Sequence, residues 1–129
     1  MDDDRSAVVN IGGEEYEMLL TTRATREIGK KYGGLSNLGE KLFSADNFEL
    51  ALSEIIWLIV LLINQPILIH NMKNKDNPKE LMTEDDVEIL TSPADLATFK
   101  NAITLAMQKG TGRNVRSEPE MGNTEAGKM

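Results

Sequence analysis

Residues 55–69 read IIWLIVLLINQPILI, and positions 55–63 form an unbroken run of nine apolar side chains. A helix that is apolar on every side has to be covered by protein or by lipid. Crossing a bilayer takes roughly 20 consecutive apolar residues, whereas Glu54 precedes this run and an Asn-Gln-Pro sequence interrupts it at 64–66. We therefore expect this stretch to form the central buried helix of a small soluble domain.

The composition is that of an ordinary globular protein, with 129 residues, 40% of them hydrophobic and 27% charged, which suits one domain. The formal net charge of −7 disfavours nucleic-acid binding, because phosphate recognition needs a basic surface. The chain has no cysteine, so disulfides and thiolate metal sites are excluded. The first residues, MDDDR, lack the apolar stretch of a signal peptide. We expect a cytoplasmic protein.

Before the apolar run, two β-prone segments flank a glycine pair and predict a hairpin over residues 7–20. A two-residue type I′ turn needs positive φ at both central residues, which glycine tolerates. In the second segment Tyr16, Met18 and Leu20 share one face. Because a lone hairpin is marginal in water, this face should lie against the helices.

Six helices are predicted from the spacing of apolar residues and from capping signals. Thr21 or Thr22 caps the first helix, and the glycine pair at 33–34 ends it. Asp46 and Glu49 form a capping-box-like start to the long apolar helix. The predicted ranges are 22–32, 36–43, 47–64, 66–73, 84–90 and 93–109.

Local signals also set the boundaries in the second half of the chain. Pro66 lacks an N–H and disfavours helical geometry at the residue before it, so we expect the long helix to break or kink there. A polar loop follows at 73–79. Thr83 caps a helix that begins with three acids, as the helix dipole favours. Ser92 and Pro93 begin the last helix as N-cap and first residue.

Together these elements predict a mainly α fold with a small N-terminal β-hairpin (α+β). The compact helical domain, built around one apolar central helix, is expected to span residues 7–110. Residues 1–6 form a charged lead-in, and residues 111–129 contain only three large apolar side chains, Val115, Met121 and Met129. Such segments cannot bury enough surface to offset the entropy of ordering. Both ends are predicted to be disordered.

No pattern of residues indicates an enzyme, a metal site or a cofactor site. His70 is the single histidine and lacks metal-ligand spacing around it, so we interpret it as a structural or surface residue. The acids at 84–88 lack EF-hand spacing and match a charged helix start. The sequence GNTEAGKM at 122–129 nearly matches a phosphate-binding loop, but methionine replaces the Mg²⁺-binding hydroxyl and no strand precedes it.

Two features are candidates for partner binding. Arg23, Arg26 and Lys30 form a basic stripe on one predicted helix of an acidic protein; such a stripe docks an acidic surface or is simply the solvated side of the helix. Trp57 lies inside the apolar run and belongs either to the core or to an interface, since exposed apolar patches mark contact surfaces. Any exposed side of the run is a place for self-association or client binding.

The order of these motifs resembles the tail assembly chaperones of long-tailed bacteriophages. The hairpin with its glycine turn is followed by LLTTRATREI at residues 19–28 and YGGL at residues 32–35. Leu38, Leu42, the apolar helix after Asp46 and the sequence TEDDV at residues 83–87 continue the likeness. The resemblance covers about residues 7–110.

This resemblance implies a role without catalysis or cofactors. Such proteins act in the host cytoplasm, bind the long helical tape measure protein, and keep it soluble until tail tube subunits polymerise around it. They are absent from the mature virion, so the implied partners are the tape measure protein and the tail tube subunit. Many are made in two lengths by a ribosomal frameshift, and Gly127-Lys128 is compatible with a slippery codon pair.

Other interpretations remain open at this point. A minor structural or connector protein of a phage tail would share the resemblance but stay in the finished particle. A small membrane-associated protein, held by residues 55–69, would use the same apolar run differently. An enzyme is the least supported alternative, because the sequence has no nucleophile–base pair and no cofactor loop.

Overall fold

The computed structural model describes residues 6–44 and 48–111. Two strands come first, β1 (Ser6–Ile11) and β2 (Glu14–Leu19), and are followed by α1 (Thr22–Tyr32) and α2 (Leu35–Ser44). The long helix α3 (Phe48–Lys73) precedes α4 (Glu84–Leu90), the 3₁₀ turn η1 (Pro93–Asp95) and α5 (Leu96–Gly110). The predicted fold class, mainly helical with an N-terminal hairpin and one long apolar helix, is confirmed.

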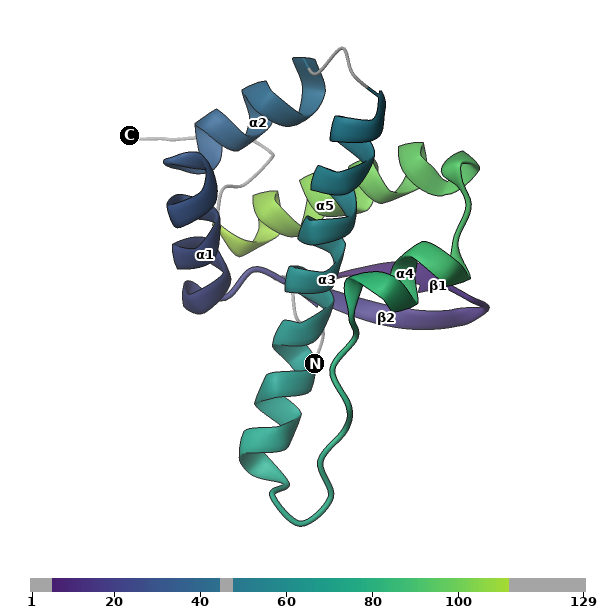
Figure 1. The fold of residues 1–129 in the computed structure, drawn as a ribbon. Helices are drawn as coiled ribbons and strands as arrows, with labels where there is room; N and C mark the ends of the chain where they lie inside the picture. The colour runs from purple at the N-terminus through teal and green to yellow at the C-terminus, as the bar shows by residue number, and fades with distance from the viewer. Residues whose placement is uncertain (1–5, 45–47, 112–129) are drawn as a thin grey trace.

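Helix α3 is the element around which the others are arranged. In Figure 1 it runs the full height of the molecule, with α1 and α2 on one side and α4 on the other, while the hairpin and α5 lie behind it. Its middle section supplies the largest group of fully buried side chains: Ile55, Leu58, Ile59, Leu62 and Ile63. The run at 55–63 is therefore mostly core, as predicted, because protein covers it on several sides.

The hairpin closes the core with one face. The strands pair antiparallel, with Val9 opposite Tyr16 and Ala7 opposite Met18, and both turn glycines have positive φ, 63° at Gly12 and 88° at the next residue. Ala7, Val9 and Met18 are buried, while Val8 and Glu17 on the other face are exposed. As predicted, the inner face lies on helices: β2 packs on α3, and β1 packs on α5.

Capping residues set the ends of α1 where the sequence predicts them. The hydroxyl of Thr21 accepts a hydrogen bond from the amide of Ala24 at 3.1 Å. At the other end Gly33 has φ 88° and donates its N–H to the carbonyl of Gly29 at 2.8 Å. Ala24 and Ile28 are fully buried, so the apolar side of α1 faces the core.

Of the break or kink predicted at Pro66, the break is wrong, because α3 continues through it to Lys73 as one helix. The segments predicted as separate helices, 47–64 and 66–73, are parts of this element. Pro66 removes one helical hydrogen bond, but Gln65 beside it is only 4% exposed and fully bonded. Its amide nitrogen donates to the carbonyl of Leu61 at 2.9 Å, and its oxygen accepts the hydroxyl of Thr21 at 2.6 Å. These contacts fix the helix to α1 directly before the proline.

Residues 74–83, here called the strap, return along the lower half of α3 in extended form (Figure 1). Asn64 bonds both backbone groups of Met82, accepting its N–H at 2.8 Å and donating to its carbonyl at 2.9 Å. Two turns further along, Asn71 bonds both backbone groups of Lys79 in the same way, at 2.8 and 3.1 Å. Two asparagines seven residues apart therefore fasten the strap to one face of α3.

The second half of the chain starts its helices with local caps. Thr83 and Asp86 form a reciprocal capping box. The amide of Asp86 donates to the threonine hydroxyl at 3.1 Å, and the amide of Thr83 donates to the carboxylate of Asp86 at 3.0 Å. The predicted range 84–90 is that of α4. The range predicted as one helix from 93 begins instead with the 3₁₀ turn η1, where Asp95 accepts the amide of Ser92 at 2.9 Å. The α-helix starts at Leu96.

Some predictions fall at or beyond the limits of the described residues. Ser6, assigned to the lead-in, is the first residue of β1, and Thr111, assigned to the tail, bonds the carbonyl of Met107 at 3.1 Å. The predicted disorder of 1–5 and 112–129 and the cap at Asp46 lie outside the described residues.

Replacing Asn71 by Ala should release the strap at Lys79, because two backbone groups lose their partners. We expect faster amide exchange at Lys79 and a free energy of unfolding lower by about 1–2 kcal/mol. Asn64→Ala should have the same effect at Met82. The matched control is Asn101→Ala on the exposed side of α5, which should leave amide exchange in the strap unchanged. Equal effects of all three variants would contradict the proposed fastening.

Gly110 is required by packing against the hairpin. A Cβ atom at this position would lie 2.4 Å from Cβ of Leu20, whereas one at Gly29 in α1 would meet no described atom within 4 Å. Gly110→Ala should therefore lower the free energy of unfolding by about 1–3 kcal/mol through overpacking. Gly29→Ala should raise it by about 0.5–1 kcal/mol, as alanine normally does inside a helix. Chemical denaturation of both variants tests the difference in sign.

Candidate functional site

A solvent-open groove of about 310 Å³ runs between α1 and α3. We call it the α1–α3 groove. Apolar side chains of α3 form most of its floor, and two residues of α1 with one each from the strap and α4 form its walls. The lining residues are Arg23, Glu27, Trp57, Val60, Leu61, Asn64, Gln65, Leu68, Leu81 and Glu84.

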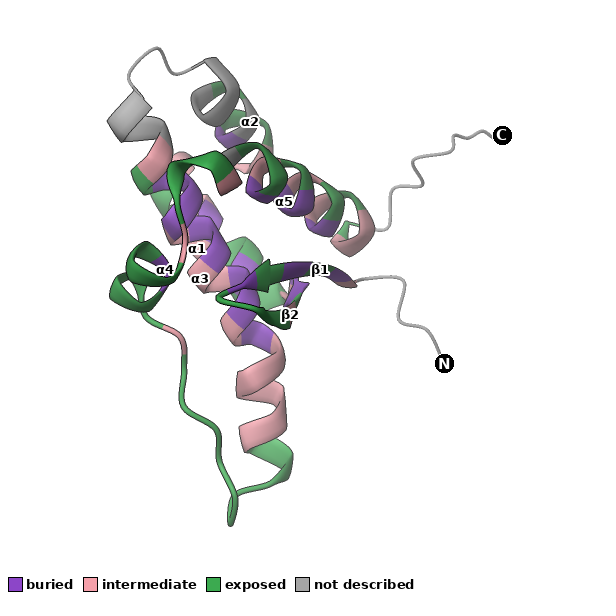
Figure 2. Ribbon diagram, turned by 90° about the vertical axis from the view of Figure 1, so that its right-hand side faces the viewer, coloured by how far each residue is buried: buried purple, intermediate pink, exposed green. Residues whose placement is uncertain are grey.

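The floor of the groove follows one side of α3. Trp57, Leu61, Asn64 and Leu68 recur at intervals of four, three and four residues, so they lie on the same helix face. All four are half-buried. Figure 2 shows that the middle of α3 is mostly buried and that its lower part is not. The groove therefore begins at the core and extends onto the less covered half of the helix.

Trp57 lies at the boundary between the core and the groove. Its ring packs edge-on against Tyr32, with centroids 6.0 Å apart and planes at 74°. The ammonium nitrogen of Lys31 lies 4.8 Å from the indole centroid, a distance at which a cation is attracted to the ring face. Trp57 therefore packs against the core and also lines an open surface, and its place in an interface stays a prediction.

Beneath this aromatic pair lies a buried polar contact. Glu54 is only 8% exposed, and its carboxylate accepts a hydrogen bond from the hydroxyl of Tyr32. Burial, and then the bond to this carboxylate, raises the pKa of the Tyr32 phenol well above its ordinary value. The contact ties α1 to α3 at the edge of the groove.

The predicted basic stripe is only partly in the groove. Arg23 lines it, whereas Arg26 and Lys30 are exposed on α1 outside the lining. Lys30 lies 3.8 Å from the carboxylate of Glu27, the acidic residue of this helix. The structure thus brings Arg23 and Trp57 to one site and leaves the other two predicted residues beside it.

Several residues in the groove or beside it were not predicted from the sequence as part of a site. Lys31 is one position along from Lys30 and was not grouped with Trp57, because the two come together only when α1 packs on α3. Leu81 is 46% exposed and lies in the strap, just after the polar loop predicted at 73–79. Its apolar side chain reaches the site because Asn64 and Asn71 fasten the strap. Periodicity within α3 could have identified Leu61 and Leu68.

Two further hollows flank α3. One of about 420 Å³ lies near Ile56 and Phe99, and one of about 570 Å³ lies between β2 and the lower part of α3, where Glu14 and Glu17 face Ile67. Among the described residues, no three His, Cys, Asp or Glu side chains are placed to hold a metal ion. His70 accepts from the amide of Asn74 at 3.3 Å and donates from Nε2 to the carbonyl of Asn77 at 3.1 Å, which is a structural arrangement.

By length and composition, α3 also meets the requirements for a membrane span. The segment Leu52–Lys73 has 22 residues with a mean hydropathy of 2.0, and 44% of its most apolar window is buried inside the protein. Core helices of soluble proteins have the same properties. This segment is longer than the run from 55 to 69 because α3 continues through Pro66.

Comparison with family models, curated proteins and solved structures found no match to this chain.

Tyr32→Phe should leave the buried Glu54 carboxylate without its donor and lower the free energy of unfolding by about 1–3 kcal/mol. The pH dependence has a definite sign. The native pKa of Tyr32 lies above the unfolded value of 10.0, because the native state favours the neutral phenol. This contribution to the stability of the native state is complete below pH 10.0 and is lost as the pH rises through the native pKa.

The two tyrosines can be separated by ultraviolet absorbance titration. In a Tyr16→Phe variant, ionisation of the remaining phenol should coincide with alkaline unfolding, because Tyr32 is protected. The pKa of Tyr16 is also raised, first by burial and then by the hydrogen bond to Glu14, but its contact is exposed. In a Tyr32→Phe variant the remaining phenol should therefore ionise before unfolding. Ionisation of Tyr32 in the folded protein near its ordinary pKa would contradict this assignment.

Proposed function

We propose that this chain is a tail assembly chaperone of a long-tailed bacteriophage, which binds the tape measure protein and keeps it soluble while the tail tube assembles. The observation that carries the proposal is the α1–α3 groove. It offers half-buried aliphatic and aromatic side chains to solvent along about three turns of a helix. Grooves of this kind accept the apolar face of an amphipathic helix.

The motifs that carry the resemblance have structural roles that support this function. The segment LLTTRATREI places the N-cap of α1 at Thr21, whose hydroxyl also bonds Gln65. The sequence YGGL ends α1 at Gly33. These residues set the position of α1 against α3, and so form the groove. Several copies along one long client would bind with high avidity even if each groove binds weakly.

The proposal can be tested by co-expressing the chain with the tape measure protein of its own genome. We expect a soluble complex and a higher soluble fraction of the client. Leu68→Ser should reduce both, because it removes apolar surface from the groove floor. Val8→Ser is the matched control, since Val8 is 54% exposed on the outer face of the hairpin, and it should change neither. No complex and no gain in client solubility would overturn the assignment.

Mass spectrometry of purified virions separates a chaperone from a minor tail component. A chaperone is expected to be absent from mature particles, and a connector or other structural protein to be present in them. The host cytoplasm is the proposed site of action.

One observation favours a second candidate, a small membrane-associated protein: the length and apolarity of Leu52–Lys73. Against it, Asn64, Gln65 and Asn71 use their side chains to bond other parts of the protein, and the middle of the helix is covered by the hairpin and α5. Recovery in the soluble fraction after lysis without detergent would exclude this alternative.

A further inference from the structure

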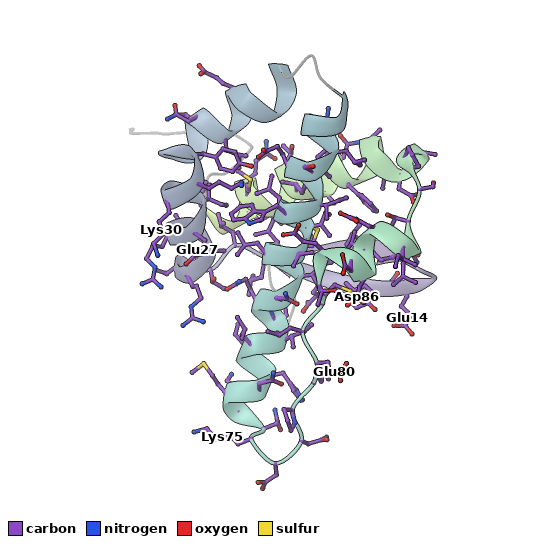
Figure 3. The ribbon with its side chains drawn as sticks, in the orientation of Figure 1. Glu14, Glu27, Lys30, Lys75, Glu80 and Asp86 are labelled. Atoms are coloured by element: carbon purple, nitrogen blue, oxygen red, sulfur yellow. The ribbon has the colours of Figure 1, made fainter. Side chains whose placement is uncertain are left out.

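The two helices beside the α1–α3 groove, α1 and α4, carry opposite net charge. Helix α1 has four basic residues, Arg23, Arg26, Lys30 and Lys31, against the single acid Glu27. Helix α4 has four acidic residues and no basic one, and its first residue, Glu84, lines the groove. Figure 3 shows Glu27 and Lys30 on one side of α3, and Glu80 and Asp86 on the other.

The basic wall is not neutralised by its own acid. The carboxylate of Glu27 lies 3.8 Å from the ammonium nitrogen of Lys30. Arg23 lines the groove, and Lys31 lies over the indole of Trp57. An anionic group on a bound helix would therefore meet two cations along this edge. The opposite edge, at Glu84, favours a cationic group. Charge complementarity of this kind contributes to specificity and register more than to affinity.

We infer that the groove takes an amphipathic helix with acidic residues along the flank facing α1 and basic residues along the flank facing α4, and that these charges set the direction of the bound helix. Turning such a helix end to end, with its apolar face still on α3, exchanges its two flanks. One direction then pairs opposite charges on both walls, and the other places like charges together. This inference rests on the proposed function, because it names the part of the client that the groove binds.

The size of the floor sets the length of the occupant. From Trp57 to Leu68 the floor spans about 17 Å, or roughly three helical turns. Met72 follows Leu68 by one turn on the same side and is 73% exposed, which extends the apolar surface beyond the groove. A single amphipathic segment of the client is therefore sufficient to fill the site.

Trp57 is an intrinsic fluorescence probe for binding, because it is the single tryptophan and lies in the groove. The test uses alanine-rich peptides of roughly 18 residues, long enough to form a helix, with a leucine stripe, glutamates on one flank and lysines on the other. A second peptide exchanges the two flanks. Each peptide is made with a dansyl acceptor at either its N- or its C-terminus, and quenching of the Trp57 fluorescence reports which end lies nearer.

We expect the end nearest Trp57 to switch when the flanks are exchanged, because each peptide turns to pair its charges with the walls. Arg23→Glu should weaken binding about fivefold to tenfold, in line with a reversed charge at an interface rim. Lys75→Glu is the matched control: it makes the same change in charge at the tip of the strap, far from α1 (Figure 3), and should leave affinity unchanged. Leu68→Ser should abolish quenching by either peptide.

The same end near Trp57 for both peptides, or equal losses with Arg23→Glu and Lys75→Glu, would overturn the inference. So would absence of saturable peptide binding together with binding to neutral lipid vesicles, which would assign the apolar stripe to a membrane. Failure of the proposed function is distinguishable. If the peptides bind in the predicted directions but the tape measure protein does not co-purify, the groove inference stands and the client is a different helical protein. If the client co-purifies but the peptides do not bind, the function stands and the groove is not its site.

Discussion

The need to cover an apolar helix on nearly every side governs the rest of this structure. From 55 to 63 the chain has no polar face, so neighbouring elements must remove it from water. The inner face of the hairpin, the apolar side of α5 and buried residues of α1 and α4 do so, and together with α3 they form one core. A chain of this length has few elements available, and the cover ends near Ile63. The open groove is a direct consequence of this limit.

Polar side chains on α3 make the long helix possible. A proline inside a helix removes a backbone hydrogen bond, and buried polar groups are tolerated only when they have partners. Gln65, the buried polar residue before the proline, has such partners: it bonds Leu61 in its own helix and Thr21 at the start of α1. Asn64 and Asn71 then bond the strap and keep an extended segment beside the helix. The residues that interrupt the apolar run are therefore the ones that connect α3 to its neighbours.

The same contacts shape the candidate site. Packing of α1 against α3, through Ile28, Tyr32 and the Thr21–Gln65 bond, places a basic helix along one edge of the floor. The capping box at Thr83 begins an acidic helix on the other edge. The acids that suit the capping box and the helix dipole of α4 thus also make this edge unlike the basic one. A site made of an apolar floor and opposite charges suits the binding of a helix.

By itself, the sequence determined the elements whose ends depend on neighbours in the chain. The glycine turn, the caps of α1, the start of α4 and the apolar run all rely on interactions within a few residues, and the structure agrees with each. Only the tertiary structure decided what depends on distant contacts: that α3 passes through Pro66, that the polar loop becomes a fastened strap, and that Arg23, Trp57 and Leu81 share a groove. The physical reason is that local signals at Pro66 and in the strap favour a break and a loop, whereas Thr21, Asn64 and Asn71 supply hydrogen bonds from residues that become neighbours only after folding.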